Sequence, residues 1–371
     1  MTIDGVDVRR VFEPGSTAEL AEMIGAAKGP LAPFGSGTRL SFGNPLGAVD
    51  AAVDTRRLDR ITEYVPADMT VHVEAGVRLG QLQDTLREQN QMLPLDPWCG
   101  REATVGGIIA TNSQGPFRAV GTIRDWILGM RVVHADGRTS RTGGRVVKNV
   151  TGYDLAKLYT GSLGSLGVIA EVSLKVRARY DGTASARIRL PDFASAADMI
   201  RALRAAPLDP VSLIWTGPMN EIRIRFGEHA SAVRWQVGQL PEGDWETFDS
   251  ESEPDLWDDA RAFYDRLPEP VVRVVARPSQ VPDVVSRFRP AAWMAHAGNG
   301  ILLMSSTPEQ IPALRREFPV VLERASLGVR TTIPTFGMRG VGYETMRRLK
   351  AALDPEGRIN PGRHVDGETG E

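Results

Sequence analysis

Two glycine-rich segments in the first half of the chain carry the residues whose types and spacing could do chemistry. The first is Pro33-Phe34-Gly35-Ser36-Gly37-Thr38, in which closely spaced glycines and hydroxyl residues follow a short apolar run. Glycine allows successive backbone N–H groups to converge on one point, and hydroxyls add further donors. This segment therefore predicts a concave nest for an anion such as a pyrophosphate. A plain turn after a strand is the competing interpretation.

The second segment runs from Ala103 to Asn112 and strengthens the first. Gly106 and Gly107 allow a ligand or another chain segment to approach the backbone closely. Thr104 and Thr111 add polar groups, and the apolar residues between them would anchor the segment in a core. Two such segments within one domain favour a binding site over two simple turns.

A third segment, Lys148–Leu158, groups two lysines, a tyrosine and an aspartate around Gly152. These residues could place cations near a phosphate or a cofactor ring. An exposed helix start with ordinary solvated charges is the alternative.

The common nucleotide-binding motifs are absent from the sequence. No G-x-x-x-x-G-K-[ST] occurs, so the chain is not a P-loop protein. No G-x-G-x-x-G lies between an early strand and a helix with an acidic residue about 20 positions later. A Rossmann domain for NAD is therefore disfavoured.

Composition and charge exclude several classes of protein. The 371 residues carry a formal net charge of −2, which gives no reason to expect a nucleic-acid partner. A single cysteine, Cys99, rules out an intramolecular disulfide and any cysteine cluster. The chain starts without a signal-peptide pattern, and no apolar run approaches the roughly 18–20 residues that span a bilayer. We expect a cytoplasmic protein with no direct membrane insertion, which could associate with a membrane only through partners.

The elements that must position these segments alternate between strand and helix. Apolar and alternating runs predict strands at residues 31–34, 70–74, 126–134, 168–176, 186–190 and 271–275. Capping and helical spacing predict helices after Ser16, around residues 79–86, and over 194–205 and 343–353. The acidic stretch from Gly238 to Asp258 is expected to be a loop, and we see no internal repeat. The length favours two domains, and glycines thin out after about Arg179, which predicts a boundary near 178–182.

Four stretches, in order, resemble the vanillyl-alcohol oxidase / p-cresol methylhydroxylase (PCMH-type) family of FAD proteins. Residues 33–43 resemble its pyrophosphate loop, and residues 103–112 its A-T-[IV]-G-G-x-x-A-x-N segment. Residues 121–125 resemble its Y-G-T-x-R-D stretch, and residues 148–169 its K-N-x-x-G-Y-D-L…G-S-E-G-x-L-G-I-I block. The likeness covers about residues 1–178, and the joint spacing is highly specific.

The resemblance implies an α+β fold. A two-subdomain PCMH-type FAD-binding domain would occupy residues 1–178, and a smaller α+β cap domain of the substrate-binding type would occupy 179–342. Residues 343–371 would return to the flavin domain, because residues 354–363 resemble the D-P-x-x-x-[LIM]-N-P-G-[KR] ending of the glycolate oxidase group. Asn360 would then lie near the isoalloxazine ring. A plain Asp-Pro and Pro-Gly turn is the alternative for this ending.

The resemblance also implies a set of cofactor-binding residues. The first loop would hold the pyrophosphate, the second segment would line the FAD, and Ile169 would contribute its backbone near the adenine. The complete expected set is Pro33, Gly35, Ser36, Gly37, Thr38, Ser41, Thr104, Gly106, Gly107, Thr111, Asn112, Asp125, Ile169 and Asn360. No catalytic residue is assigned, although Lys148, Tyr153 and Asn360 are weak candidates. No metal site is expected.

Within the family, the likeness is greatest to the glycolate oxidase group and above all to its short E subunit. That subunit works with a flavin-bearing D subunit and an iron–sulfur subunit. The resemblance implies an FAD-dependent oxidoreductase that takes part, within a complex, in oxidising glycolate, D-lactate or a similar small 2-hydroxyacid. A lone cysteine could hold no iron–sulfur cluster, so electrons would leave to a partner.

Two other functions stay open. The chain could be a stand-alone FAD-dependent oxidoreductase of another hydroxyl substrate, with a carboxylate held near Lys148, Tyr153, Arg330 or Arg339. It could also be a non-catalytic assembly subunit.

The sequence departs from the family pattern at several positions. Leu40 stands where some relatives attach FAD to a histidine, and Cys99 does not match the known cysteinyl site, so non-covalent FAD is expected. The stretch from His296 to Gly300 lacks the aspartate and the second histidine of the H-x-G-D-G-N-x-H metal motif, and no E-H-G follows. His296 is therefore expected to be a hydrogen-bonded core histidine. Leu163 replaces the usual glutamate of G-S-E-G, so the substrate site is expected to be degraded or remodelled.

Overall fold

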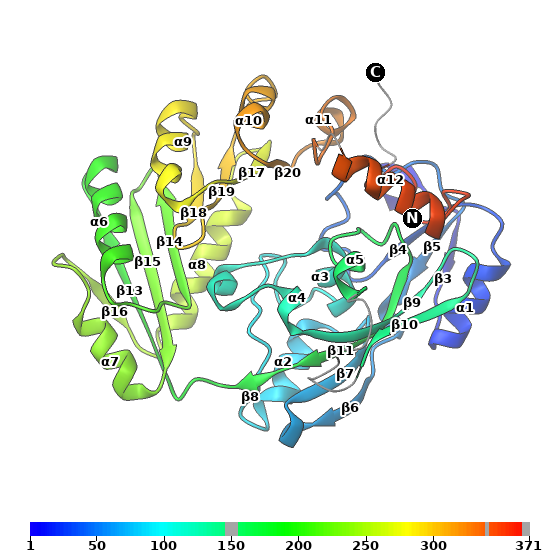
Figure 1. The fold of residues 1–371 in the computed structure, drawn as a ribbon, viewed down its shortest axis with the longest axis horizontal. Helices are drawn as coiled ribbons and strands as arrows, with labels where there is room; N and C mark the ends of the chain where they lie inside the picture. Colours follow the sequence, from blue (N-terminus) through cyan, green and yellow to red (C-terminus); the bar gives the residue numbers. More distant parts are fainter. Residues whose placement is uncertain (145–154, 338–340, 366–371) are drawn as a thin grey trace. The chain divides into compact units, whose positions relative to one another are not determined.

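The computed structural model describes residues 1–144, 155–337 and 341–365. It divides into two compact units that each combine helices with sheets, so the α+β fold class is confirmed (Figure 1). Unit 1 comprises residues 1–114, 121–179 and 330–371, and unit 2 comprises residues 115–120 and 180–329. Lys148, Tyr153 and Arg339 lie outside the described residues.

Unit 1 begins with a hairpin and a small parallel sheet. The hairpin joins β1 (Thr2–Ile3) to β2 (Val6–Asp7) through Asp4 and Gly5, which both have positive φ, as such two-residue turns require. The sheet has the order β3-β5-β4, with strands at Arg10–Phe12, Ala51–Asp54 and Leu31–Phe34. Helix α1 (Thr17–Ala26) starts after Ser16, whose hydroxyl accepts from the Glu19 N–H as predicted.

The second sheet of unit 1 has five antiparallel strands in the order β10-β9-β11-β7-β6. Their bounds are Thr139–Gly143, Ile127–Val133, Val168–Lys175, Thr70–Glu74 and Ile61–Val65. The predicted strands at 70–74, 126–134 and 168–176 are thus confirmed to within one residue at each end. One face packs on helices α2 (Leu79–Arg87), α3 (Val105–Thr111) and α5 (Ala156–Tyr159). Helix α4 (Ile123–Trp126) precedes β9, and short strands β8 (Gln91–Met92) and β12 (Arg177–Ala178) pair with each other.

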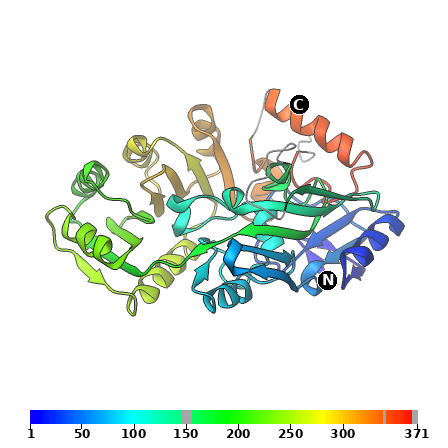
Figure 2. The same ribbon diagram turned by 60° about the horizontal axis from the view of Figure 1, so that its bottom comes forward.

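The C-terminal segment is part of unit 1 (Figure 2). Helix α11 (Leu327–Thr332) begins in the last residues of unit 2 and ends in unit 1, and helix α12 (Val341–Leu353) is followed by a stretch that runs alongside β4. The Leu31 N–H donates to Arg358 O at 2.7 Å, and the Asn360 N–H donates to Leu31 O at 2.8 Å. This stretch therefore covers the edge of the parallel sheet just before the glycine-rich loop begins.

Unit 2 contains an eight-stranded antiparallel sheet with the order β16-β13-β15-β14-β18-β19-β17-β20. The first four strands in chain order are β13 (Gly182–Arg189), β14 (Ser212–Gly217), β15 (Glu221–Glu228) and β16 (Glu246–Phe248). The remaining strands are β17 (Val271–Val275), β18 (Trp293–His296), β19 (Ile301–Ser305) and β20 (Val320–Arg324). The helices are α6 (Phe193–Ala205), α7 (Ala230–Gly238), α8 (Glu253–Asp265), α9 (Val281–Phe288) and α10 (Ile311–Glu317).

The order of elements in unit 2 repeats. Strand–helix–strand–strand–helix–strand occurs from β13 to β16 and again from β17 to β20, with α8 between the two copies. The copies meet where β14 pairs with β18. The structure thus contains a repeated arrangement that the sequence did not reveal.

The predicted loop at Gly238–Asp258 is wrong, because it contains β16 and the first turns of α8. Helix α8 buries Leu256, Trp257, Ala260 and Tyr264 at helical spacing, and its acidic residues lie between them. The acidic composition concealed that stripe.

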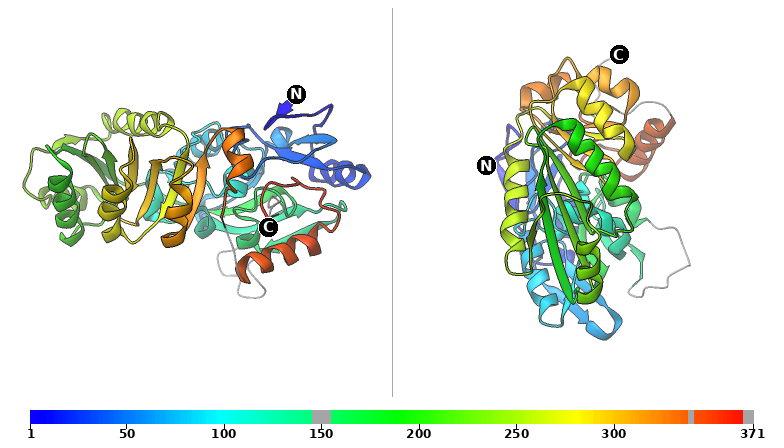
Figure 3. Two further views of the ribbon diagram at one scale, coloured as in Figure 1. Left: turned by 90° about the horizontal axis from the view of Figure 1, so that it is seen from above. Right: turned by 90° about the vertical axis from the view of Figure 1, so that its left-hand side faces the viewer.

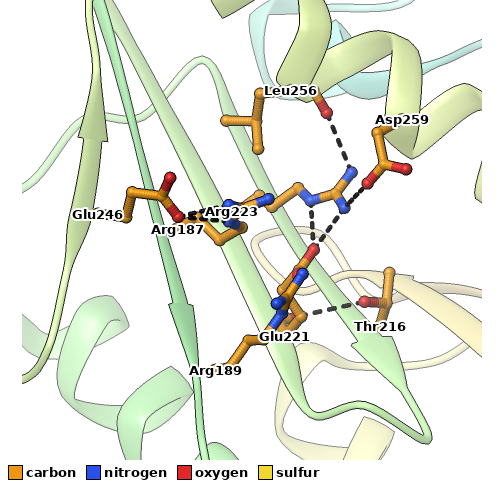
Figure 4. A network of polar contacts seen from close by, with 8 residues as sticks. All are labelled: Arg187, Arg189, Thr216, Glu221, Arg223, Glu246, Leu256 and Asp259. Carbon is orange, nitrogen blue, oxygen red and sulfur yellow. Dashed lines mark hydrogen bonds and ion pairs between the residues drawn. The ribbon is translucent and has the colours of Figure 1, made fainter.

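The sheet of unit 2, whose backbone is drawn in Figure 3, has a stacked aromatic pair on one face and a buried ion pair on the other. Trp215 stacks on Phe193 of α6 with 5.0 Å between ring centroids. On the opposite face, Arg223 donates to Glu221 at 2.6 Å, to Leu256 O of α8 at 3.1 Å and to Asp259 at 2.5 Å (Figure 4). Because Arg223 and Glu221 are fully buried, this network fixes α8 on the sheet.

Candidate cofactor site

The predicted segments of unit 1 form the walls of two adjoining cavities. Both are open to solvent, and including that open part the first measures about 660 Å³ and the second about 400 Å³. Residues that line both come from the first loop, from α3 and from the turn before β11, namely Pro33, Phe34, Gly35, Gly107, Ala110 and Leu163. Because they share these residues, the two cavities make one continuous cleft, which we call the cofactor cleft.

The first wall is the loop that leaves β4. In the described part of the chain, the N–H groups of Ser36, Gly37 and Thr38 donate no hydrogen bond. Gly37 has a φ of +77°, which is accessible to glycine at little cost. Three successive free donors beside a cavity can bind an anion, and the three residues line the first cavity.

Gly35 sits where this loop crosses the start of α3. A Cβ on Gly35 would lie 2.1 Å from Thr104 Oγ1, so no larger residue fits without a shift. Thr104 is the N-cap of α3, and its hydroxyl accepts from the Gly107 N–H at 3.3 Å. Threonine is a favoured N-cap because its hydroxyl satisfies a donor that the helix leaves free.

Gly106 brings the start of α3 against the end of β7. Its N–H donates to Ala75 O at 2.8 Å, and a Cβ on Gly106 would lie 2.7 Å from the Ala75 Cβ. The glycine pair therefore serves helix packing at Gly106 and borders the cleft at Gly107.

Asn112 ends α3 in the left-handed conformation, with a φ of +47°. Its Oδ1 is buried and accepts no hydrogen bond in the described part of the chain. A buried acceptor without a donor is costly, and a hydrogen-bond donor of a bound molecule would satisfy it.

The remaining wall joins the C-terminal segment to the turn before β11. Asn360 is buried, and its Nδ2 donates to Leu163 O at 2.7 Å. A Cβ on Gly164 would lie 3.3 Å from that same Nδ2, and Gly164 has a φ of +66°. Asn360 lines the first cavity and Ile169 lines the second.

The structure brings most of the sequence-predicted residues together. Those that line the cleft are Pro33, Gly35, Ser36, Gly37, Thr38, Thr104, Gly106, Gly107, Thr111, Ile169 and Asn360. Ser41, Asn112 and Asp125 do not line either cavity. Asp125 is exposed and caps α4, because it accepts from the N–H and the hydroxyl of Thr122 at 2.8 and 3.0 Å.

Several cleft residues were missed by sequence reasoning. Arg39 lies over the Phe42 ring at 4.4 Å, and Arg363 and Cys99 also line the first cavity. Arg363 had a signal in the sequence, because it fills the [KR] position that follows N-P-G in the family ending. For Arg39 and Phe42, the sequence contained no signal beyond their place in the loop.

His296 lies in unit 2 and is buried at the end of β18, as expected of a core residue. Burial disfavours its charged form and Arg118 repels it, so its pKa falls to about 3. Among the residues that the structure describes, no group of three or more His, Cys, Asp or Glu could hold a metal ion.

The cleft fits FAD on two observations. It offers free backbone donors for a pyrophosphate at Ser36–Thr38, and it has glycine where its walls cross most closely, at Gly35 and Gly106. The described residues include no helix long and apolar enough to cross a bilayer.

Comparisons with known proteins point the same way. Residues 8–143 match the family model described as an FAD binding domain, and residues 337–364 match that of the C-terminal domain of FAD linked oxidases. The chain is 31% identical to glycolate oxidase subunit GlcE of Escherichia coli, over 91% of this chain and 93% of the relative. It is 26% identical to the mitochondrial D-lactate dehydrogenase [cytochrome] of Arabidopsis thaliana, over 96% and 73% of the two chains. Alkyldihydroxyacetonephosphate synthase shares the fold, with a TM-score of 0.67, 16% identity and coverage of 95% and 75%.

Proposed function

Because the chain belongs to the PCMH-type family of FAD-linked oxidases, we propose that it is the FAD-binding subunit of a complex that oxidises glycolate or D-lactate. It is an FAD-dependent oxidoreductase of the 2-hydroxyacid type. The proposal includes a division into an FAD-binding domain at 1–178, a cap domain at 179–342 and a C-terminal segment at 343–371. It also includes a cytoplasmic location, with any membrane contact made through partners.

The observation that carries this proposal is the match to a glycolate oxidase subunit over nearly the whole length of both chains. Relatives named as D-lactate dehydrogenases and as a glycolate oxidase subunit GlcD also match. Since the described residues offer no metal-ligand group, we assign the metal-assisted substrate site to a flavin-bearing partner. An iron–sulfur partner would take the electrons onward.

The chain's own residues would bind and orient the cofactor. The N–H groups of Ser36, Gly37 and Thr38 would hold the pyrophosphate. Thr104, which caps α3 and lies against Gly35, would hold the loop close to the start of that helix. Asn360, which lines the first cavity, would add a polar contact from the opposite wall. When bound, FAD can accept a hydride from carbon and release single electrons.

We propose that the FAD is held without a covalent bond. Leu40 has no group that could form one, whereas Cys99 lines the cleft with its Sγ 3.4 Å from Ser113 Oγ. Acid precipitation of the purified chain should release all of the flavin into the supernatant. Yellow colour that stays with the pellet, and disappears in Cys99→Ser, would overturn this part of the proposal.

The proposed function is tested by comparing the chain alone with the chain co-expressed with the flavin-bearing and iron–sulfur partners. Each preparation is assayed with glycolate and with D-lactate, using an artificial electron acceptor. We expect a flavin spectrum from the chain alone and substrate turnover only in the complex. Turnover by the chain alone would instead show a stand-alone oxidoreductase, and a colourless chain would favour an assembly subunit.

A further inference from the structure

Three buried charged residues of unit 1 form a cluster behind the glycine-rich loop. The Asp4 cluster consists of Asp4 from the first hairpin and of Arg330 and Arg363 from the C-terminal region. Asp4 Oδ2 lies 2.9 Å from the Nη1 atoms of both arginines. All three side chains are at most 6% exposed, so solvent screens these charges only weakly.

The Asp4 cluster holds the second half of the glycine-rich loop by its carbonyl groups. Arg363 donates to Leu40 O and, at 3.3 Å, to Asn44 O. Arg330 donates to Gly43 O at 3.3 Å. Because the N–H and C=O of a trans peptide point in opposite directions, a Leu40 carbonyl turned towards Arg363 directs the next N–H away from the cluster.

The cluster has more positive than negative charge. Asp4 supplies one carboxylate for two guanidinium groups, so these three side chains together carry a charge of +1. Burial lowers the pKa of Arg363 to about 10, with Asp4 opposing this shift and Arg330 adding to it. Arg363 therefore stays protonated at neutral pH, and it lines the first cavity of the cofactor cleft.

We propose that Arg363, held in place by Asp4, is a positioning residue for the pyrophosphate loop and supplies the buried positive charge that favours the diphosphate of FAD. The inference rests on the proposed FAD site and adds to it a charge that the glycine-rich loop itself lacks. Backbone N–H groups give the site its shape, and the buried guanidinium gives it a preference for a doubly negative ligand.

The test compares Arg363→Met with Arg358→Met in the full-length apo chain. Arg358 is a matched control, because it belongs to the same segment and donates to the backbone carbonyls of Ala135, Ile24 and Ala27, away from the cleft. Calorimetric titration with FAD should give a Kd at least about tenfold higher for Arg363→Met than for the control, as expected for loss of a charged partner. Arg363→Lys should recover part of the affinity.

A second titration separates charge from structure. ADP carries the diphosphate and adenine of FAD, whereas adenosine lacks the phosphates. Arg363→Met should weaken ADP binding and flatten its dependence on salt, while adenosine binding stays within about twofold. Equal weakening of ADP and adenosine would mean that Arg363 only supports the fold, and would overturn the inference.

The outcome also distinguishes this inference from the proposed site. If Gly35→Ala abolishes FAD binding but Arg363→Met binds FAD as the Arg358 control does, the inference fails and the site stands. If neither Gly35→Ala nor Arg363→Met changes FAD affinity, the proposed site is misplaced and the inference fails with it.

Discussion

Gly35 and Thr104 meet where the glycine-rich loop crosses the start of α3, and only a hydrogen atom fits between them. The same hydroxyl that would collide with a Cβ on Gly35 also caps α3. At the scale of single residues, one contact thus sets both the course of the loop and the start of the helix that faces it. That is why a glycine is needed at a position whose φ is not itself unusual.

Gly35→Ala should displace Thr104 and so disturb both walls of the cleft. We expect the flavin content of the purified chain to fall at least about tenfold, and the stability of the apo chain to fall by about 1 kcal/mol through loss of the cap. Absorbance per chain and urea unfolding measure the two effects. Gly238→Ala is the control, since nothing lies within 4 Å of its Cβ and alanine is the better helix former. Full flavin content in Gly35→Ala would contradict the prediction.

His296 should make stability depend on pH. Its pKa is about 3 in the folded chain, against an ordinary value of 6.5, because of burial and then of repulsion by Arg118. As the pH falls below 6.5, His296 binds a proton in the unfolded chain, whereas in the folded chain it does not bind one until about pH 3. Stability is therefore unaffected above pH 6.5 and is lost between about pH 6.5 and 3, at about 1.4 kcal/mol per pH unit.

The His296→Gln variant isolates this contribution. Urea unfolding between pH 6 and pH 4 should give a slope of free energy against pH that is smaller than that of the wild type by about 1.4 kcal/mol per unit. Other titrating groups affect both proteins equally and cancel. Equal slopes would show that His296 is accessible to protons in the folded chain.

At the scale of elements, the C-terminal helix is held by a buried ion pair in addition to Leu349 and Leu353, which are partly buried against the core of unit 1. Lys350 is the buried residue of α12, and its Nζ donates to Asp354 at 2.6 Å, to Ser165 O at 2.8 Å and to Ile359 O at 3.0 Å. Asp354 in turn accepts from the N–H groups of Arg358 and Ile359. This network shapes the turn that delivers Asn360 to the cleft.

Lys350→Met should release the C-terminal stretch from β4. Removing one member of a buried pair leaves Asp354 without its counterion and should lower stability by about 3 kcal/mol or more. Hydrogen exchange should speed up at Leu31, whose N–H bonds Arg358 O. Arg347→Met, which removes an exposed pair with Glu344, should cost under about 1 kcal/mol. Unchanged exchange at Leu31 in Lys350→Met would contradict the role of the pair.

At the scale of the whole molecule, the two units differ in how their cores are built. Unit 1 packs helices on one face of an antiparallel sheet and adds a parallel sheet. Unit 2 uses one long antiparallel sheet made of two copies of the same element order, with buried charges under α8. Each unit therefore has its own core, and the residues of the cofactor cleft all belong to unit 1.

We expect calorimetric unfolding to show two transitions, and we expect FAD to raise the midpoint temperature of only one of them. A ligand that binds the native state stabilises the unit that holds it by mass action. Lys350→Met should lower the midpoint temperature of the same transition whose midpoint FAD raises, because the substitution and the ligand both act on unit 1. A single transition that moves as a whole with FAD would show that the two units unfold together.

Local patterns were the predictable part of the fold. The strand at Leu31–Phe34 and the one at Thr70–Glu74 were predicted to the residue, because alternation and glycine punctuation are local signals. The loop predicted at Gly238–Asp258 was wrong, because acidic residues on the exposed side of α8 masked its buried stripe. The repeat in unit 2 was missed because packing needs the same alternation of elements, not the same residues.

The sequence by itself determined an anion-binding loop and most of the residues that line the cleft, since glycine and hydroxyl spacing acts through the local backbone at Gly35–Thr38 and Gly106–Gly107. The resemblance of four stretches to a family of FAD proteins determined the cofactor class. Only the tertiary structure decided which distant charges meet. Asp4 and Arg363 are 359 positions apart, and they pair because the C-terminal stretch docks along β4. A charge acts on whatever lies close to it in space, and no spacing in the sequence records that distance.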